Sequence, residues 1–301
     1  MNIVIPKPFD GEAEYKFLET AKAALLAQTE PIVDAIFERE GVVAVLIDGT
    51  VCSGKKGVAL ELKKRIEERR RLAKVISMAD FLKNRASFAE ECKKRGVPMR
   101  QEAIGALDFT YFEKCLDLIF SEETALLPGY DYKEGVRCSW IPFTARENHV
   151  ILIEGSYAMS PRVRLLSQAE GALKVYVDTI SGYESNRGAF LPRELRLARK
   201  FARDHRKHGR SAEQIYQSWM SANEEQRPYS GGLADLCDFK VDTTSVHEPM
   251  ILKNEINKTL GSIKSNSKIY AAGKKFLSRF SEFPDMESDL IEKDSFYSTF
   301  L

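Results

Sequence analysis

Residues 42–56 read VVAVLIDGTVCSGKK, and this stretch decides the fold. Its apolar, β-branched part at 42–47 predicts a strand that is buried on both faces of a sheet. A glycine-containing turn follows, and the Ala, Leu, Lys and Glu that dominate residues 56–71 predict a helix. A strand, a glycine-rich loop and a helix in this order are typical of a phosphate-binding loop, or P-loop.

The loop itself reads GTVCSGK at 49–55. A phosphate chain needs closely spaced backbone N–H groups, and glycines let the backbone bend tightly enough to supply them. The N-terminal end of the following helix adds a favourable dipole. The sequence therefore predicts a bound nucleotide whose outer phosphates are reached by the side chain of Lys55. The expected nucleotide-binding residues of the loop are Gly49, Thr50, Cys52, Ser53, Gly54 and Lys55.

The residue after Lys55 departs from the usual pattern of a P-loop. Ser or Thr normally stands there, because its hydroxyl coordinates the Mg²⁺ of the nucleotide. The chain has Lys56 instead, and a protonated ammonium group repels a cation and cannot bind it. Three interpretations stay open: other residues hold Mg²⁺, Lys56 itself neutralises phosphate charge, or the metal-dependent chemistry is lost.

Strands and helices alternate along the chain. Short segments rich in β-branched and other apolar residues predict further strands at 74–78, 149–153 and 173–177, and a last strand is expected at 238–241. Helices are predicted at 11–40, 80–126, 192–207 and 211–225. Pro31 is expected to divide the first helical region, and a loop is expected around Pro128 and Gly129. This order predicts an α/β fold, a parallel β-sheet flanked by helices on both faces, with ligands at the carboxyl ends of the strands.

Three regions are expected. A helical N-terminal extension spans 1–40, and a P-loop core spans 41–244 with a lid at about 192–212. A helical and irregular C-terminal extension spans 245–301.

Composition excludes several classes of function. The chain has 45 basic and 44 acidic residues, a net charge of +1, so no nucleic-acid partner is expected. No apolar run reaches the roughly 18 residues of a membrane span. Its five cysteines are widely spaced without a metal-binding pattern, which favours reduced thiols and a cytoplasmic protein. Assembly into a homo-oligomer stays open.

Several motifs, in order from about residue 41 to 242, resemble the uridine kinase and phosphoribulokinase group of P-loop kinases. The segment KVISMADF resembles the second strand and "DxF" motif of that group, and VILIEG resembles its "VVLFEG" segment. The segments that carry the resemblance are 74–81 (KVISMADF), 107–109 (LDF), 130–132 (YDY, followed by Arg137), 150–155 (VILIEG), 177–179 (VDT) and the lid helix 199–210 (RKFARDHRKHGR).

The resemblance implies transfer of the γ-phosphate of ATP or GTP to a hydroxyl group of a nucleoside or sugar-like acceptor. It implies a cationic cradle of Lys55 with the lid residues, and carboxylates that organise Mg²⁺. The implied catalytic residues are Lys55, Asp80, Glu154 and Arg203; Asp80 and Glu154 are the metal candidates. Lys56, Arg199 and Arg210 join the implied nucleotide-binding residues, and Asp108, Tyr130 and Arg137 are the implied acceptor-binding residues.

Two departures leave two hypotheses open. The catalytic base of the group aligns with Ala79, and Asp80 follows it, although adjacent residues of an extended chain face opposite sides. In the lid, Lys200 and His208 stand at positions of arginine. The first hypothesis is a working small-molecule kinase with Asp80 as its base. The alternative is a catalytically impaired pseudokinase that binds nucleotide or a protein partner.

Overall fold

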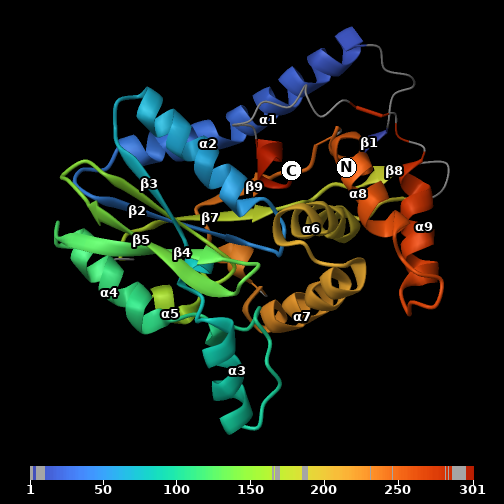
Figure 1. The fold of residues 1–301 in the computed structure, drawn as a ribbon. Helices are drawn as coiled ribbons and strands as arrows, with labels where there is room; N and C mark the ends of the chain where they lie inside the picture. The colour runs from blue at the N-terminus through green and yellow to red at the C-terminus, as the bar shows by residue number, and fades with distance from the viewer. Residues whose placement is uncertain are drawn as a thin grey trace.

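A computed structural model describes residues 3–4, 11–164, 166, 170–184, 189–230, 232–245, 247–281, 283, 285–286 and 296–301. Its centre is a five-stranded parallel sheet with the strand order β3-β6-β2-β7-β9 (Figure 1). The strands are β2 (Val43–Gly49), β3 (Ala73–Ser77), β6 (Val150–Glu154), β7 (Leu173–Asp178) and β9 (Phe239–Asp242). All five predicted strands are confirmed, and β2, which carries the P-loop, lies in the middle.

The middle strand separates two apolar cores. Val45 and Ile47 of β2 face one core together with α1 and α2, whereas Leu46 faces the other core. Every residue of β2 and β6 is buried, which explains why continuous apolar runs form these strands.

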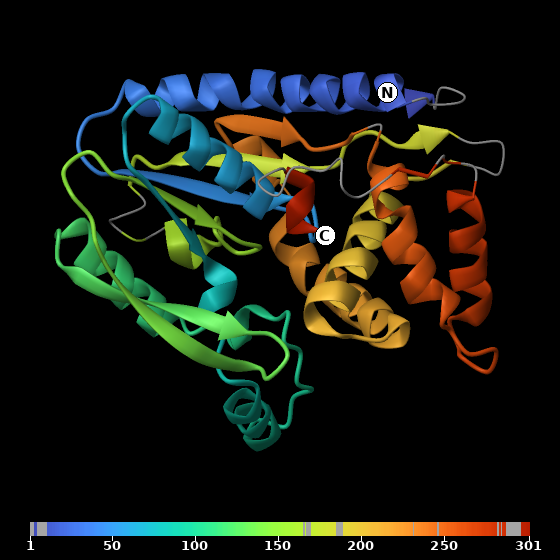
Figure 2. The ribbon, with the colours of Figure 1, turned by 45° about the horizontal axis from the view of Figure 1, so that its top comes forward.

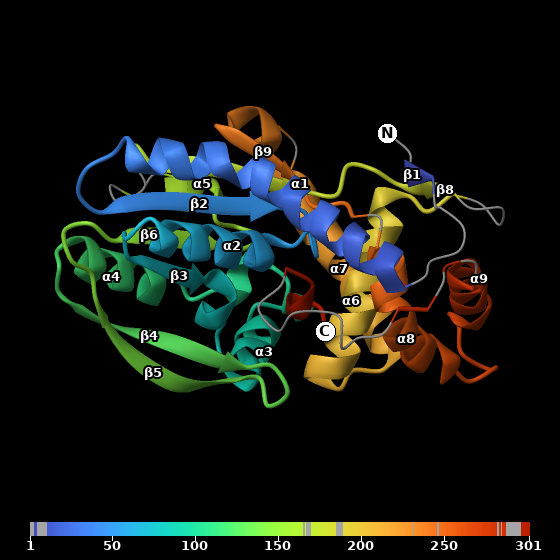
Figure 3. The ribbon, with the colours of Figure 1, turned by 90° about the horizontal axis from the view of Figure 1, so that it is seen from above.

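Helices α1 (Gly11–Phe37) and α2 (Lys55–Glu68) cover one face of the sheet (Figure 3). Pro31 lies inside α1, so the predicted division of this helix was wrong. An interior proline costs a helix about 3 kcal/mol. Burial of Ile32, Val33 and Ile36 against the sheet just after Pro31 offsets this cost and keeps the helix continuous.

The other face carries α4 (Phe109–Phe120), α5 (Pro161–Arg164) and an antiparallel hairpin of β4 (Thr124–Asp131) and β5 (Val136–Thr144). The helical prediction for 80–126 was wrong in part. Only α3 (Arg85–Lys94) and α4 are α-helices there, beside the 3₁₀ turns η1 (Met78–Phe81) and η2 (Ile104–Ala106). The loop expected at Pro128 and Gly129 is part of β4, where a Cβ on Gly129 would collide with Ser139 of β5.

A group of helices lies beyond the carboxyl edge of the sheet (Figures 1 and 2). It contains α6 (Pro192–His208), α7 (Ala212–Ser230), α8 (Glu248–Gly261) and α9 (Tyr270–Phe280), with the 3₁₀ turn η6 (Phe296–Thr299). These helices share a core in which Ala198 and Ala202 of α6 meet Leu252 and Ile256 of α8. The short strands β1 (Ile3–Val4) and β8 (Tyr183–Glu184) pair in parallel nearby. The 3₁₀ turn η4 (Leu233–Leu236) precedes β9 and packs Leu233 into the core that contains Leu46.

The helix predicted at 192–207 is confirmed as α6, and its role as a lid stays a prediction. Helix α7 continues to Ser230, beyond its predicted end. The region boundaries near residues 40 and 244 stay predictions, and parts of both extensions lie outside the described residues. Within the described ranges, no helix is both long enough and apolar enough to cross a membrane.

Candidate active site

A cavity of about 950 Å³ opens at the carboxyl edge of the sheet, over the P-loop. Its walls come from the loop, from η1, from the ends of β4 and β6, from α6 and α7, and from residues 298–300. The predicted site residues that line it are Cys52, Ser53, Gly54, Lys55, Lys56, Asp80, Tyr130, Glu154, Arg203 and Arg210. Five others do not line it: Gly49, Thr50, Asp108, Arg137 and Arg199.

Two glycines shape the loop. Gly49 has a φ of 150°, and a Cβ there would collide with the backbone carbonyl of Val177 in β7. Gly54, with a φ of 96°, is the N-cap of α2 and supplies no capping side chain. The first-turn N–H groups of a helix have no intrahelical acceptor, so α2 presents free donors at the cavity. Ser53 adds a buried hydroxyl that has no hydrogen-bond partner among the described residues.

The loop is also held by hydrogen bonds from behind. Thr243 Oγ1 donates to the carbonyl of Ser53 (2.6 Å), and Arg199 Nη1 donates to the carbonyl of Cys52 (3.2 Å). Arg199 itself forms a buried ion pair with Glu248 of α8. Its guanidinium group is therefore placed behind the loop rather than in the cavity, and its predicted contact with nucleotide stays a prediction.

The N-terminal part of the loop is hydrogen-bonded to β7. Thr50 Oγ1 donates to Asp178 Oδ1 (2.5 Å), which also accepts from Arg196 Nη1 (2.7 Å). Asp178 belongs to the VDT segment, but the sequence assigned it no role. The structure gives it the role of bracing the loop.

Lys55 is buried at the base of the cavity. Its Nζ donates to the carbonyls of Gly49 (3.0 Å) and Thr50 (2.8 Å). Burial lowers the pKa of Lys55, while the nearby carboxylates of Asp48 and Glu154 oppose this shift. Asp48 accepts from the N–H groups of Gly49 and Met159, and burial raises its pKa to about 6. Asp48 was not among the predicted site residues, although a charged residue at the end of an apolar strand is a signal.

Two carboxylates lie in the cavity near the loop. Glu154 ends β6 and is the register partner of Ser77 at the end of β3, whose hydroxyl donates to it (2.5 Å). Asp80 lies in η1, and burial raises its pKa to about 6; Lys56 opposes the shift and Glu154 adds to it.

On an extended chain Ala79 and Asp80 would face opposite sides, so Asp80 could serve as base only if the local backbone differed, and it does differ. Both residues belong to the 3₁₀ turn η1, and both line the cavity. A 3₁₀ helix has three residues per turn, so neighbouring side chains diverge by about 120° rather than 180°. Asp80 therefore reaches the cavity although it is shifted by one residue from the expected place.

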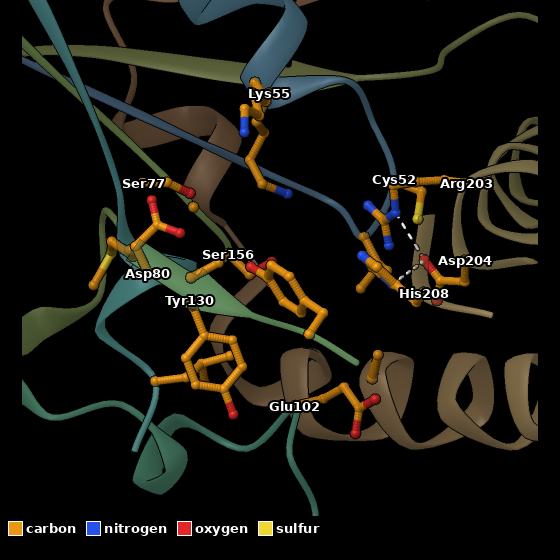
Figure 4. Close-up of a pocket in the computed structure, with 18 of the residues that line it drawn as sticks. Cys52, Lys55, Ser77, Asp80, Glu102, Tyr130, Ser156, Arg203, Asp204 and His208 are labelled. Atoms are coloured by element: carbon orange, nitrogen blue, oxygen red, sulfur yellow. Dashed lines mark hydrogen bonds and ion pairs between the residues drawn. The ribbon is translucent and has the colours of Figure 1, made fainter. Parts of the chain in front are cut away.

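On the α6 side of the cavity, one carboxylate pairs with several basic side chains. Asp204 of α6 is only 1% exposed and forms ion pairs with Lys200 (2.9 Å), Arg203 (2.8 Å) and Arg210 (3.7 Å). Burial alone would raise its pKa, but the surrounding cations outweigh burial and hold it well below its usual value. Figure 4 shows Arg203, Asp204 and His208 on the side of the cavity opposite Asp80.

The end of the cavity away from Lys55 is lined by aromatic and polar side chains. Tyr130 accepts a hydrogen bond from Gln101 Nε2 (3.2 Å), and Tyr157 donates to the carbonyl of Glu102 (2.8 Å). Tyr132 lies between the two sides of the cavity: its ring stacks on His208 of α6, with centroids 4.7 Å apart, and the charges of Asp80, Glu154 and Arg203 act on its hydroxyl group. Figure 4 shows Glu102 and Tyr130 at this end.

Asp108 and Arg137 lie beside this end and pair with each other (2.9 Å). Asp108 also caps α4 by accepting from the N–H of Tyr111, and Arg137 donates to the carbonyls of Phe81 and Leu82. Their side chains brace the wall around η1, so direct contact of either with an acceptor stays a prediction.

These features were compared with known proteins. A family model described as "Phosphoribulokinase / Uridine kinase family" matches residues 43–231, more than half of the chain. The chain belongs to this family. It is a family of small-molecule kinases, so the predicted enzyme class, a phosphotransferase with a hydroxyl acceptor, is confirmed. Membership implies use of a nucleoside triphosphate and usually of Mg²⁺. No curated protein matches the chain in sequence.

Three solved kinase structures are similar to the chain. A possible uridine kinase from Bacillus stearothermophilus is 16% identical, with a TM-score of 0.50 over 72% of this chain and 99% of that one. A putative fructose transport system kinase from Silicibacter sp. TM1040 is 15% identical, with a TM-score of 0.48 over 66% and 93%. Phosphoribulokinase from Rhodobacter spheroides is 16% identical, with a TM-score of 0.42 over 67% and 73%. With the family match, the first of these confirms the predicted P-loop kinase fold.

The Mg²⁺ implied by the phosphoribulokinase / uridine kinase family fits part of this site. In the described part of the chain, no group of three or more His, Cys, Asp or Glu side chains forms a metal cage. Mg²⁺ at a nucleotide keeps phosphate and water ligands and needs only one or two carboxylates from the protein. Glu154 and Asp80 can supply these, whereas Lys56 brings a positive charge to the place of the usual hydroxyl.

Proposed function

We propose that the chain transfers the γ-phosphate of ATP or GTP to a hydroxyl group of a nucleoside or sugar-like acceptor. The observation that carries this proposal is that the uncapped start of α2, Lys55 and Asp80 all border one cavity. Phosphate binding and proton removal are then close enough to act on the same pair of reactants.

The phosphate chain would bind the free N–H groups at the start of α2 and the unpartnered hydroxyl of Ser53. Lys55 now donates to two loop carbonyls and can donate to phosphate oxygens from the same place. Arg203, on the facing side, adds positive charge against the charge that develops on the transferred group.

Asp80 would take the proton from the attacking hydroxyl group. A base must be ionised at neutral pH, and a pKa of about 6 leaves the Asp80 carboxylate largely ionised while it stays basic enough to accept a proton. Glu154 and Asp80 would hold Mg²⁺ together with phosphate oxygens, and the metal would neutralise phosphate charge. Lys56 supplies a fixed positive charge, like that of the metal, near the phosphates.

The acceptor class follows from the far end of the cavity. Rings of Tyr130 and Tyr157 line this end and offer apolar surface on which a base or sugar ring can pack. Gln101 and Glu102 line the same end and offer hydrogen-bonding groups for hydroxyls. This mixture of rings and polar groups is typical of pockets for small polyhydroxyl compounds.

A catalytically impaired nucleotide-binding protein is the second candidate. The observation that favours it is Lys56, whose charge acts on Asp80 in the same cavity. If that ammonium group holds Asp80 in place of the metal, nucleotide can bind without reaction.

One experiment separates the two candidates. ATP and GTP binding is measured by calorimetry with Mg²⁺ and with EDTA, followed by γ-phosphate release on a panel of nucleosides and sugars. If the chain is a working kinase, turnover is expected with at least one acceptor. Nucleotide binding that is independent of Mg²⁺, with no turnover on any acceptor, supports the impaired protein. Lys55→Ala should abolish most binding, and Lys64→Ala, an exposed lysine on the same helix, is the matched control. Binding that survives Lys55→Ala contradicts both candidates.

A further inference from the structure

Residues 296–301, here called the aromatic segment, read FYSTFL and lie against the start of α2. A Cβ added to Gly54 or to Gly57 would collide with the ring of Phe296. The ring therefore packs directly against these two glycines at the start of α2. Figure 1 shows this segment, in red, between α2 and α6.

Two cations hold the aromatic segment in place. The guanidinium carbon of Arg199 lies 5.5 Å from the ring centroid of Phe296 and 4.9 Å from that of Phe300. Lys207 Nζ donates to the carbonyls of Ser298 and Thr299, both at 2.9 Å. Phe300 is only 3% exposed, so the segment is docked on the fold.

The docked segment occupies space that a nucleotide needs. Ser298, Thr299 and Phe300 line the same cavity as Lys55. A phosphate chain in a P-loop is held by backbone N–H groups of the loop and of the first helical turn. The nucleoside end of the ligand must then pass the first turn of α2, where Phe296 covers Gly57.

We propose that the aromatic segment competes with the nucleoside triphosphate for this site and sets the nucleotide affinity of the chain. The inference rests on the proposed function of the P-loop. With the segment docked, the start of α2 is closed to the α-phosphate and nucleoside. With the segment displaced, the free N–H groups, Ser53 and Lys55 are open to the ligand.

If the same rings helped to bind the nucleotide, their removal would change ATP affinity in the opposite direction. If Phe296 and Phe300 formed a wall on which the nucleotide base stacks, their removal would weaken binding. If they compete with the nucleotide, their removal strengthens it, because apparent affinity falls with the fraction of molecules whose site is open.

The test measures ATP affinity of the full chain by calorimetry, in Mg²⁺ and in EDTA. The double variant Phe296→Ala/Phe300→Ala is expected to bind ATP at least about tenfold more tightly. This is the change that results when the site is open in about a tenth of the unaltered molecules or fewer and in all molecules of the variant. Phe280→Ala removes a buried ring of the same helical core away from the loop and is the matched control. Unchanged or weaker binding by the double variant overturns the proposal.

A second measurement uses the unaltered chain and does not depend on the folding of a variant. The N–H groups of Phe300 and Leu301 both donate to the carbonyl of Tyr297. Saturating ATP should speed hydrogen exchange at these positions, since it displaces the segment. Equal or slower exchange with ATP bound overturns the proposal.

Failure of this inference differs from failure of the proposed function. Lys55→Ala added to the double variant should abolish the tightened binding. If ATP binding depends on Lys55 but its affinity is unchanged in Phe296→Ala/Phe300→Ala, only the inference is overturned. An absence of ATP binding by both the unaltered chain and the double variant overturns both.

Discussion

Arg199 and Glu248 form an ion pair in which both side chains are completely buried, at 0% exposure. Arg199 also donates to the carbonyl of Cys52 and to Thr243, so the pair connects α8 with the back of the P-loop. Glu248 lies outside the residues that match the family model. The loop of this chain thus depends on a side chain from its C-terminal region.

Removal of Glu248 should therefore destabilise the fold. In Glu248→Ala the guanidinium group of Arg199 stays buried without its counter-charge, which typically costs about 3–5 kcal/mol. The free energy of unfolding, measured in urea, should fall by that amount. The exposed pair of Arg162 and Glu113 is the control, and Glu113→Ala should change stability by less than about 1 kcal/mol. Similar losses in both variants would contradict this prediction.

The carboxylate of Asp204 should give stability a pH dependence in acid. Its pKa is held well below the ordinary 3.8, because Arg203 and Lys200 outweigh the effect of burial. A carboxyl group whose pKa is lowered by folding stabilises the fold above its unfolded pKa and loses this contribution as pH falls through its folded pKa. The stability of the unaltered chain should thus decrease progressively below about pH 4.

Asp204→Asn should remove this component. At pH 7 the variant should be less stable by about 3 kcal/mol, since the cations around Asp204 lose their counter-charge. Below about pH 4 its stability should fall less steeply than that of the unaltered chain, and the two curves should converge. Urea unfolding at a series of pH values measures this. Parallel curves over the whole range would show that Asp204 is not the group responsible.

The central strands of the sheet could be predicted because their own sequences are continuously apolar. Residues 42–47 and 150–153 are continuous apolar runs, which occur where both faces of a strand are buried. The hairpin of β4 and β5 was missed because it lacks this signal. β5 has exposed residues on both faces, including Trp140 and Ile141, so only its pairing with β4 defines it.

The site was predictable where spacing along the chain decides it. Lys55 follows from the loop pattern and Glu154 from the end of an apolar strand, and both line the cavity. The burial of Arg199 was not predictable, since its partner Glu248 lies 49 residues further along the chain. The direction of Asp80 depends on the 3₁₀ turn η1, which no local pattern in the sequence marked.

Lys56→Thr should make nucleotide binding more dependent on Mg²⁺. The variant gains a hydroxyl group that can bind the metal and loses an ammonium group that can bind phosphate. A hydrogen bond to a charged group is worth about 1.5–3 kcal/mol, so ATP affinity in EDTA should fall roughly tenfold or more. Lys64→Thr, at an exposed position of the same helix, is the control. An unchanged ratio of affinities with and without Mg²⁺ would place Lys56 away from the metal.

Asp80→Asn should separate chemistry from binding. The amide keeps the size of the side chain in η1 but cannot accept the proton of the attacking hydroxyl group. Loss of a general base lowers kcat by about 10²–10⁴-fold, whereas ATP affinity in EDTA should stay within a few-fold. Steady-state kinetics with the best acceptor of the panel and calorimetry with ATP measure the two effects. Asp117→Asn, an exposed carboxylate on α4, should change neither, and a kcat that Asp80→Asn leaves intact would assign the base elsewhere.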